Sequence, residues 1–391
     1  MATNLSVDAT DAAGLARVVA EHQIDLVIVG PDAALAAGVT DACLSAGAVV
    51  FGPTAAGARI ETSKVFAKEI MDASSIPTAA WRAGTVATRD ELRDFAAALH
   101  GKCVVKADGL ALGKGVVMCD DLATAELAIT ACLDDQRFGS AGERVVVEER
   151  LAGHEVSVFA LCDGTRAHLL PMACDYKRAF DGDAGPNTGG MGAYTPPREL
   201  DGATLLDAVA QDVIQPCLDA LAARDTPFRG CLYAGLMLTD DGLRVLEFNA
   251  RFGDPETQAL VMALDPGRFA DLVIACAAGE LLGNGREPQR RAAVAVVAAA
   301  RGYPGAVTTG SPITLPLPDG SDTMIFHAGT AWESGTLLTA GGRVLAVAAA
   351  GDDVEVARER AYAVMDRVEF DGKRCRGDIG AAKPVAYSGQ S

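Results

Sequence analysis

Residues 11 to 60 alternate between helical patterns and short apolar strands. One helical pattern leads to the apolar run Ile24 to Gly30, and a second, alanine-rich pattern leads to Val49 to Gly52. This alternation is typical of a parallel α/β sheet, in which a helix connects neighbouring strands. The chain enters the pattern at a helix, whereas such a sheet normally opens with a strand and a glycine-rich turn. We therefore predict an N-terminal α/β lobe over residues 1–61 that lacks its first strand and glycine-rich loop.

A second region, dominated by short strands, follows a helix for which Ser63 is the candidate N-cap. The sequence Thr88 to Glu91 matches a capping box, which predicts a further helix start. Beyond it lie one helix, Ala123 to Leu133, and four β-type runs bounded by glycine: Lys102 to Asp108, Val116 to Cys119, Arg144 to Leu151 and Glu155 to Cys162. This mixture predicts a small α+β lid over about residues 78–151.

The second half of the chain begins with a glycine-rich loop over 181 to 193 and a long helix around 202 to 224. The runs Leu232 to Leu238 and Leu243 to Asn249 are separated by the turn signal Asp-Asp-Gly, which predicts a β-hairpin. Beyond about residue 276, alanine- and valine-rich strands with Gly-Pro turns indicate a separate C-terminal domain.

Composition excludes several classes of protein. The net charge is −18 over 391 residues, so nucleic acid and anionic lipid would be repelled over most of the surface. The longest apolar run, Ala292 to Ala300, is too short to cross a bilayer. The ten cysteines contain no CxxC pair, which favours reduced core thiols over a zinc site or a disulfide framework. We expect a cytoplasmic monomer that binds neither nucleic acid nor membranes.

The strongest chemical signal is the segment VLEFNARFGDPETQ at 245 to 258. Residues two apart in a strand point to the same face, so Glu247 and Asn249 present oxygen atoms side by side. Mg²⁺ takes such hard ligands and commonly uses only one or two protein groups, with water and phosphates completing its shell. The alternative is a solvent-facing polar stripe on an edge hairpin.

A second signal is VVKADGLALGKGVV at 104 to 117, where Lys106 closes an apolar strand and a glycine-rich loop follows. Glycine lets backbone amides approach phosphate oxygens, and lysine supplies charge. The loop is neither a Walker P-loop nor a GxGxxG turn, because its spacing differs and a strand follows it. An ordinary glycine hairpin remains the alternative. The residues concerned are Gly109, Gly113, Lys114 and Gly115.

Two polar segments carry weaker signals. Glu148 to Leu151, with Glu155 further on, lies where one strand ends and the next begins, so backbone groups there can meet an adenine edge while a carboxylate takes ribose hydroxyls. A solvated charge cluster is the alternative. The segment 175 to 194 combines charged residues with glycines, and such a loop can close over an anionic intermediate or simply cover the surface.

Taken in order, these segments resemble the phosphoribosylamine–glycine ligases, a family of ATP-grasp enzymes. Coverage extends from near the N-terminus to about residue 380, and GPNTGGMGAY and FGDPETQ are the most specific matches. The other matching segments are IVGPDAALAAGV, SKVFAKE, VVKADGLALGKGVV, VVVEERLAGHEVSVF, FHAGT and CRGDIG. The resemblance implies a multidomain α/β and α+β protein with an ATP-grasp domain over 62–275, an incomplete Rossmann-like N-terminal lobe and a C-terminal domain over 276–391.

The resemblance also implies roles in ATP and metal binding. Lys64 and Lys106 are expected to contact the ATP phosphates, and the loop over 109 to 115 is expected to cover them. Adenine is assigned to Glu148, Glu149 and Leu151, and ribose to Glu155. Glu247 and Asn249 are expected to bind Mg²⁺ or Mn²⁺.

The remaining implied roles concern glycine and its acyl phosphate. The residues expected to face them are Arg251, Asp175, Lys177 and Arg178, with a substrate loop formed by Asn187, Thr188, Gly189, Gly190 and Asp254. In the family mechanism, the carboxylate of glycine takes the γ-phosphoryl group of ATP. The amine of 5-phosphoribosylamine then captures the resulting glycyl phosphate, which yields glycinamide ribonucleotide, ADP and phosphate in de novo purine biosynthesis. Metal and lysines offset the charge gathered at the transferring group.

Three departures from the family pattern bear on the amine substrate. Met1 aligns within the first lobe, and the family's GGREHA-type loop is not found in this sequence. Either the natural chain begins upstream of Met1, or this form lacks part of the amine substrate's pocket. Asp32 and Ala34 stand where the family usually has Glu and Pro, and Tyr176 replaces a histidine, which removes a group that titrates near neutrality. Two alternatives follow: an impaired form that binds MgATP but lacks part of the phosphoribosylamine pocket, and another ATP-grasp carboxylate–amine ligase.

Overall fold

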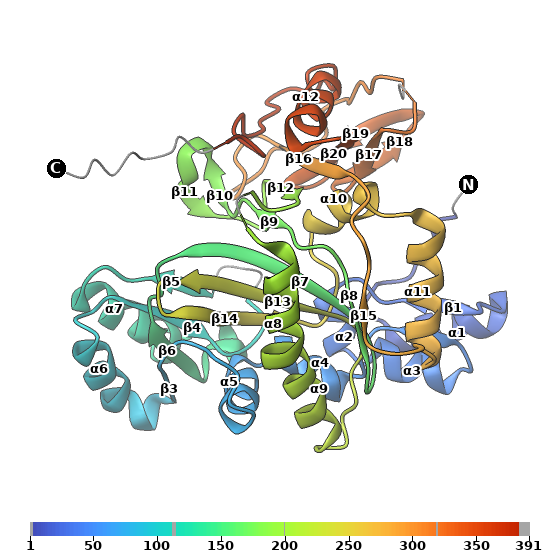
Figure 1. Ribbon diagram of the computed structural model, residues 1–391. Coiled ribbons are helices and arrows are strands. Elements are labelled where there is room, and N and C mark those ends of the chain that lie inside the picture. Colours follow the sequence, from blue (N-terminus) through green and yellow to red (C-terminus); the bar gives the residue numbers. More distant parts are fainter. Residues whose placement is uncertain (1–2, 112–114, 199, 318–319, 383–391) are drawn as a thin grey trace. The chain divides into compact units, whose positions relative to one another are not determined.

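The computed structural model describes residues 3–111, 115–198, 200–317 and 320–382 (Figure 1). The chain forms two compact units that interleave along the sequence. The first comprises Met1–Leu170, Ala203–Gly253 and Pro266–Glu287, and the second Pro171–Gly202, Asp254–Asp265 and Pro288–Ser391. The predicted domain boundaries at residues 61 and 275 stay predictions. Within the described ranges, no helix is both long and apolar enough to span a membrane.

The N-terminal part of the first unit contains the expected parallel pair of strands. β1 (Leu26–Ile28) pairs with β2 (Val49–Phe51), with Leu26 opposite Val49. The alanine-rich helix is interrupted at Gly38, whose φ of 77° lies in the left-handed region that glycine tolerates best. The helices here are α1 (Ala12–His22), α2 (Asp32–Ala36), α3 (Val39–Ser45) and α4 (Ala55–Thr62).

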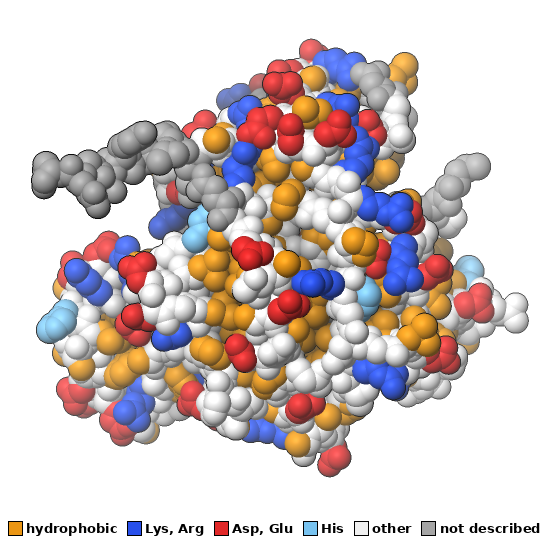
Figure 2. Space-filling view, viewed as in Figure 1, with side chains coloured by type: hydrophobic (Ala, Val, Ile, Leu, Met, Phe, Trp, Pro, Cys, Tyr) orange, Lys and Arg blue, Asp and Glu red, His pale blue; other side chains and the backbone are white. Residues whose placement is uncertain are grey.

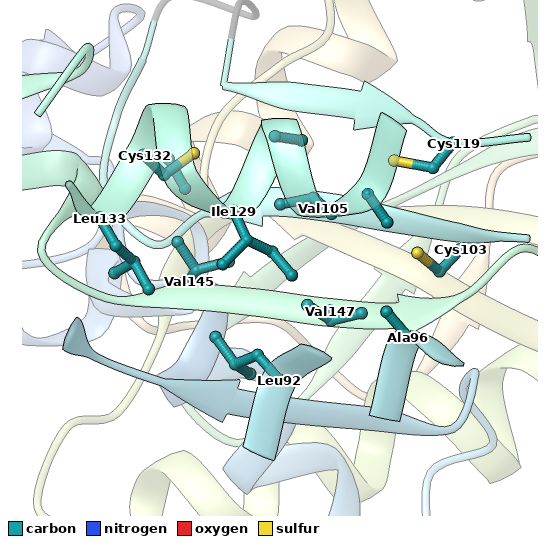
Figure 3. Close-up of a cluster of buried hydrophobic side chains, with 13 residues drawn as sticks. Leu92, Ala96, Cys103, Val105, Cys119, Ile129, Cys132, Leu133, Val145 and Val147 are labelled. Carbon is teal, nitrogen blue, oxygen red and sulfur yellow. The ribbon is translucent and has the colours of Figure 1, made fainter. Parts of the chain in front are cut away.

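The predicted lid region contains a four-stranded antiparallel sheet in the order β3-β6-β4-β5, with two helices packed on it. Its elements are β3 (Trp81–Gly84), α6 (Arg89–Ala98), β4 (Cys103–Ala107), β5 (Val116–Met118), α7 (Leu122–Leu133) and β6 (Val145–Glu149), with 3-10 turns at Val86–Thr88 and Gly139–Gly142. Figure 3 shows Leu92 and Ile129 from the helices gathered with Val105 and Val147 of the sheet. Burying each such side chain contributes about 1.5–3 kcal/mol, which makes the lid sheet a firm support.

The predicted capping box at Thr88 is wrong. Thr88 makes no side-chain cap for α6, and its hydroxyl instead accepts a hydrogen bond from the Thr85 amide at 3.0 Å. The capping box belongs to the short 3-10 turn before α6, with Thr85 as its N-cap and Thr88 as its last residue. The Thr88 hydroxyl is therefore engaged by the Thr85 amide and does not cap α6.

A five-stranded sheet in the order β14-β13-β7-β8-β15 forms the body of the first unit. The predicted hairpin is confirmed as β13 (Arg229–Thr239) and β14 (Gly242–Asn249). A β-bulge leaves Leu246 without a register partner, because Gly235 pairs with Glu247 and Leu236 pairs with Val245. The other elements are β7 (His154–Asp163), β8 (Ala167–Leu169), β15 (Gly285–Arg286), α5 (Lys64–Ala73) and α11 (Pro266–Ala278).

The long helix predicted around 202 to 224 is present but contains a π turn. It runs as α8 (Gly202–Val209), a π segment (Ala210–Ile214) and α9 (Gln215–Ala222). Pro216 accounts for the irregularity, because it has no N–H and its ring crowds the carbonyl group of Asp212 four residues earlier.

The second unit is built on a sheet in the order β17-β20-β16-β12-β9. Its strands are β9 (Cys174–Asp175), β12 (Gly192–Thr195), β16 (Ala292–Ala299), β17 (Thr323–His327) and β20 (Arg343–Gly351). α10 (Glu256–Ala263) and α12 (Val354–Met365) pack on this sheet. Alanines at the α10 contact, such as Ala259 and Ala295, let helix and sheet approach closely.

The predicted glycine-rich loop over 181 to 193 has more regular structure than expected. Two short antiparallel strands, β10 (Arg178–Phe180) and β11 (Ala184–Asn187), enclose a 3-10 turn at Asp181–Asp183. A second ribbon consists of β18 (Thr330–Glu333) and β19 (Thr336–Thr339).

On the face shown in Figure 2, acidic and basic side chains are interspersed. Any group of cations that binds phosphate must therefore be a local cluster.

Candidate functional site

The first turn of α5 is fixed to the end of β4 by Ser63 and Asp108. As predicted, Ser63 caps the helix: its Oγ accepts a hydrogen bond from the Phe66 amide at 3.1 Å. The same hydroxyl donates to Asp108 Oδ1 at 3.0 Å, and this carboxylate oxygen also accepts from the Val65 amide at 2.8 Å. The position of the lysines that follow on α5 is therefore set by a capped and anchored helix start.

Lys64 begins α5 and lies among charged groups from three other segments. Its Nζ donates to the Gly109 carbonyl oxygen at 3.4 Å. Burial lowers the pKa of Lys64, the Glu247 carboxylate opposes that shift, and the Lys106 ammonium adds to it. The structure thus brings together the two lysines and the acidic residue that the sequence assigned to phosphate and metal.

Glu148 is the most buried acidic residue of this group, with 2% of its surface exposed. Its carboxylate forms ion pairs with Lys68, at 2.7 Å, and with Lys106. Burial alone raises the pKa of Glu148, but the two ammonium groups together outweigh burial and leave the pKa below its ordinary value. Glu148 is therefore part of a buried ionic network, which removes the solvated-cluster alternative for this residue.

Two hydrogen bonds hold β14 at its bulge. Lys106 Nζ donates to the Leu246 carbonyl oxygen at 3.2 Å, and Thr78 Oγ1 donates to the Val245 carbonyl oxygen at 2.6 Å. A bulge bends a strand and redirects the side chains that follow it. The direction of the next residue, Glu247, therefore depends on contacts with β4 and with the segment before β3.

Beyond the bulge, the register is regular from Glu247 to Asn249, so these two side chains share a face as predicted. Gly235 lies opposite Glu247, and a Cβ there would lie 3.4 Å from Glu247 Cγ, so glycine leaves the carboxylate room. Asn249 is 9% exposed. The described residues contain no cluster of three or more His, Cys, Asp or Glu suited to a metal. The carboxylate–amide pair nevertheless fits Mg²⁺, whose remaining ligands are commonly water and phosphate oxygens.

Arg251 and Glu61 extend the site beyond the end of β14. Arg251 Nη2 contacts Glu61 Oε1 at 2.9 Å and donates a long hydrogen bond to Asn249 Oδ1 at 3.4 Å. Glu61 Oε2 accepts from the Ala250 amide at 2.8 Å. Burial raises the pKa of Glu61, although Arg251 counteracts part of that shift. Glu61 thereby orients the guanidinium group assigned to the acyl phosphate.

The segments assigned to the nucleotide base and to the phosphate cover lie partly at the surface. Glu149 is exposed, and Leu151 and Glu155 are half-buried. Gly109 donates its amide to the Ala141 carbonyl oxygen at 3.1 Å, and a Cβ there would lie 2.8 Å from Ala141. A Cβ on Gly115 would lie 2.7 Å from the Ala111 Cβ. The other two predicted loop residues, Gly113 and Lys114, fall outside the described residues.

The predicted substrate loop lies in the second unit, where Arg343 contacts it. Arg343 Nη1 donates to the carbonyl oxygens of Gly189 and Asp254, each at 2.7 Å, and Nη2 contacts Asp254 Oδ2 at 2.9 Å. Thr188 Oγ1 donates to the Lys177 carbonyl oxygen at 2.9 Å. Asn187, Thr188, Gly189, Gly190 and Asp254, which were predicted to act together, therefore lie in one connected loop system.

The segment 175 to 178 is held by the CRGDIG motif. Arg376 is 1% exposed, and its guanidinium lies 4.7 Å from the centre of the Tyr176 ring. Arg376 Nη1 donates to the Arg178 carbonyl oxygen at 3.0 Å, and the Tyr176 hydroxyl accepts from the Gly380 amide at 3.0 Å. Burial raises the pKa of Tyr176. Lys177 Nζ lies 4.0 Å from Asp175 Oδ2.

Four residues of this arrangement were not predicted from the sequence: Lys68, Glu61, Arg343 and Arg376. Lys68 could have been found, because it lies four residues after Lys64 and so on the same helix face. Glu61 and Arg343 reach their partners over long sequence separations, for which a single sequence gives no signal. Arg376 pairs with the nearby Asp378, but its contact with the Arg178 carbonyl oxygen is equally long-range.

Known proteins of one family match this chain along most of its length. Sequence profiles for three domains of phosphoribosylglycinamide synthetase match the chain in order: the N domain over residues 1–61, the ATP-grasp (A) domain over 62–257 and the C domain over 293–382. The chain belongs to the phosphoribosylglycinamide synthetase family. The family predicted from the sequence and its ATP-grasp fold are thereby confirmed.

Relatives of this phosphoribosylglycinamide synthetase family member carry the name phosphoribosylamine–glycine ligase. The phosphoribosylamine–glycine ligase of Caulobacter vibrioides is 46% identical over 379 residues, which cover 96% of this chain and 87% of the relative. A crystal structure of phosphoribosylamine–glycine ligase from Thermotoga maritima matches with a TM-score of 0.76 and 39% identity, over 84% of this chain and 81% of that one.

A more distant structural match shares the fold alone. It is the biotin carboxylase domain of the Hydrogenobacter thermophilus 2-oxoglutarate carboxylase, solved with MgADP and bicarbonate. The TM-score is 0.74 at 16% identity, over 96% of this chain and 81% of that one. The ATP-grasp architecture is therefore common to this family member and to a protein whose sequence has diverged widely.

Proposed function

We propose that this chain is an ATP-dependent carbon–nitrogen ligase that joins glycine to 5-phosphoribosylamine. The products are glycinamide ribonucleotide, ADP and phosphate, and the step belongs to de novo purine biosynthesis. The observation that carries the proposal is the cluster of Lys64, Lys106 and Glu247, of which Lys106 is buried and the other two are half-buried, in a chain of this family. Carboxylate is a poor acyl donor, so the reaction needs ATP to convert glycine into glycyl phosphate, and this group is suited to binding a phosphorylated nucleotide.

The ammonium groups of Lys64 and Lys106 hold the phosphates of ATP. Lys106 is buried and Lys64 is half-buried, and this partial loss of water strengthens their attraction for anions. Glu149 and Leu151 offer backbone groups to adenine, and Glu155 offers its carboxylate to ribose. These assignments are supported by the position of all five residues within the range that matches the family's ATP-grasp domain.

Glu247 and Asn249 hold Mg²⁺. Their shared strand face and the oxygen atoms they present support this assignment. When bound there, the ion would act as a Lewis acid and offset the negative charge on the phosphoryl group during its transfer. The related fold that was solved with MgADP also supports a magnesium nucleotide.

Arg251 orients the acyl phosphate, and Glu61 fixes the guanidinium for this task. In the second unit, the loop with Asn187 to Gly190 and the segment with Asp175, Lys177 and Arg178 bind the glycine and amine side of the reaction. Arg343 and Arg376 keep both segments ordered, so their backbone groups are preorganised for an anionic substrate.

A test of this function measures ADP release with glycine alone, with 5-phosphoribosylamine alone and with both. We expect release only when both substrates are present, together with glycinamide ribonucleotide in equal amount. Binding of MgATP without any turnover, or turnover with a different acid or amine, would contradict the proposal.

We also propose that Mn²⁺ substitutes for Mg²⁺ and that the enzyme works as a cytoplasmic monomer on small-molecule substrates. The oxygen ligands suit both ions. Nine of the ten cysteines are buried and Cys375 is half-buried, and buried reduced thiols are usual in the cytosol. Activity assayed with each metal ion tests the substitution by Mn²⁺, and sedimentation of the purified protein tests whether it is a monomer.

A further inference from the structure

Lys68 lies beside the proposed nucleotide site, yet the reaction as described gives it no task. It follows Lys64 by one helical turn on α5 and is 2% exposed. Its Nζ contacts Glu148 Oε2 at 2.7 Å and donates to Thr78 Oγ1 at 2.7 Å. A buried ammonium group is costly unless it is paired, so a lysine kept here calls for a reason beyond packing.

The arrangement around Glu148 supplies that reason. One carboxylate serves two ammonium groups, because Oε2 contacts Lys68 while Oε1 contacts Lys106. The single negative charge is therefore divided, and Lys106 keeps a net attraction for a further anion. Without Lys68, the whole charge of Glu148 would act on Lys106, and at low dielectric constant that attraction competes strongly with a phosphate.

Lys68 also reaches the metal-binding strand. Thr78 accepts the hydrogen bond from Lys68 and donates its own to the Val245 carbonyl oxygen at 2.6 Å. Val245 lies directly before the bulge that turns Glu247. Lys68 thus connects β6, which carries Glu148, to β14, which carries the proposed magnesium ligands.

We propose that Lys68 is a positioning residue for MgATP. By sharing Glu148 it leaves Lys106 able to bind a nucleotide phosphate, and through Thr78 it steadies the strand that carries Glu247. This inference rests on the proposed function of the same site. Lys68 itself touches no substrate.

The primary experiment measures the dissociation constant of MgATP for the full chain by calorimetry. Lys68→Met should weaken binding about tenfold, the scale of one charge-assisted hydrogen bond. Lys102→Met is the matched control, because Lys102 is an exposed lysine directly before the first residue of β4 in the lid sheet. The affinity of Lys102→Met for MgATP should stay within about twofold of wild type. Equal affinities for wild type and Lys68→Met would overturn the proposal.

A second variant separates charge sharing from simple loss of structure. If Lys68 acts mainly through Glu148, then the double variant Lys68→Met with Glu148→Gln should bind MgATP within about threefold of Glu148→Gln alone, because no carboxylate charge is left to share and only the contact with Thr78 is lost. A double variant that binds about tenfold or more weakly than Glu148→Gln alone would overturn the proposal, and this comparison decides the matter even if Lys68→Met does not fold. Lys68→Arg should retain most of the affinity.

Turnover distinguishes this inference from the proposed function. In the ADP-release assay with both substrates, Lys68→Met should raise KM for MgATP about tenfold and leave kcat within about twofold, as expected for loss of uniform binding. A fall in kcat with unchanged KM would contradict the positioning role. Wild-type protein that binds MgATP but releases no ADP would defeat the proposed function alone, since the binding comparison for Lys68 would still stand.

Discussion

Among single residues, burial decides which charged groups can serve the reaction. Lys106 and Glu148 are buried, so the attraction between them is much stronger than that of a surface ion pair, and Lys64 beside them is half-buried. Glu247 is only half-buried and follows the bulge in β14. It is therefore the acidic group of the cluster that remains accessible to a metal ion.

Replacing Glu247 by alanine should abolish magnesium-dependent ADP formation, with a fall of roughly a hundredfold or more, because a metal ion contributes several kcal/mol to phosphoryl transfer. The thermal unfolding temperature should change little, since the side chain is half-buried at the end of a strand. Glu333→Ala, at an exposed position of β18, is the control. Unchanged turnover in Glu247→Ala would refute the metal assignment.

Glu148 predicts a specific dependence of stability on pH. Its pKa in the folded protein lies below the ordinary value of 4.5, so its stabilising contribution is present above that value and is lost as pH falls through the lowered pKa. Glu148→Gln should cost about 3–5 kcal/mol near neutral pH, because it leaves two buried ammonium groups unbalanced. Unfolding measured from pH 7 downward should show this difference shrinking below pH 4.5. A constant difference would contradict the assignment.

At the scale of elements, the proposed nucleotide site depends on how α5 starts, and the proposed substrate loop of the second unit depends on how its backbone turns. α5 presents Lys64 and Lys68 from its first two turns, and it packs against β14. In the second unit, Gly190 has a φ of 110°, and a Cβ there would lie 2.5 Å from Pro255 Cδ. Both features are local requirements of backbone geometry.

Ser63→Ala should lower the free energy of unfolding by about 1–2 kcal/mol, as the loss of an N-cap usually does. It should also raise KM for MgATP, because the same hydroxyl anchors α5 to Asp108. Asp121→Ala removes a comparable cap, the one on α7, where Oδ1 accepts from the Thr124 amide at 2.8 Å. Chemical denaturation should show similar losses for both variants, and KM should change in Ser63→Ala alone.

Gly190→Ala should disrupt the substrate loop, because it combines an unfavourable φ with a clash against Pro255. We expect a loss of about 1–3 kcal/mol in stability, the cost of a strained backbone, and a strong fall in kcat/KM for the amine substrate. Gly182→Ala is the control: its φ is 69°, but nothing lies within 4 Å of its added Cβ. Equal activity in the two variants would contradict the proposal that this loop binds substrate.

For the whole molecule, the interleaving of the two units is the decisive property. β16 of the second unit pairs with β12, and α10 packs on the same sheet. Both β12 and α10 come earlier in the chain, and residues Pro266–Glu287 of the first unit separate them from β16. A C-terminal segment cut from the chain would therefore expose alanine and valine side chains on an open strand edge.

A fragment comprising residues 276–391 is accordingly expected to aggregate or remain unfolded. It lacks β12 and α10, which cover β16 in the intact chain. Circular dichroism with thermal melting is the measurement, and the full chain is the reference. A cooperative melt of the isolated fragment would show that the second unit folds without these segments.

Much of the secondary structure could be predicted from local patterns. The parallel strands of the N-terminal lobe, the hairpin β13–β14 and the helix capped by Ser63 were all predicted, because periodicity and turn residues are local properties of the chain. The capping box predicted at Thr88 is wrong, because the Thr88 hydroxyl accepts a hydrogen bond from the Thr85 amide and does not cap α6. The glycine-rich loop after Phe180 was missed as a ribbon, because its glycines mask the strand pattern.

The sequence by itself determined the family, the ATP-grasp fold and the placement of Glu247 and Asn249 on one strand face. Motifs and the two-residue period of a strand depend only on residues that are close together in the chain. Tertiary structure alone decided that Glu148 is divided between Lys68 and Lys106, and that Arg343 and Arg376 hold the loops of the second unit. These contacts join residues far apart in the chain. Only folding brings such partners within reach, and the burial that makes their charges matter arises at the same step.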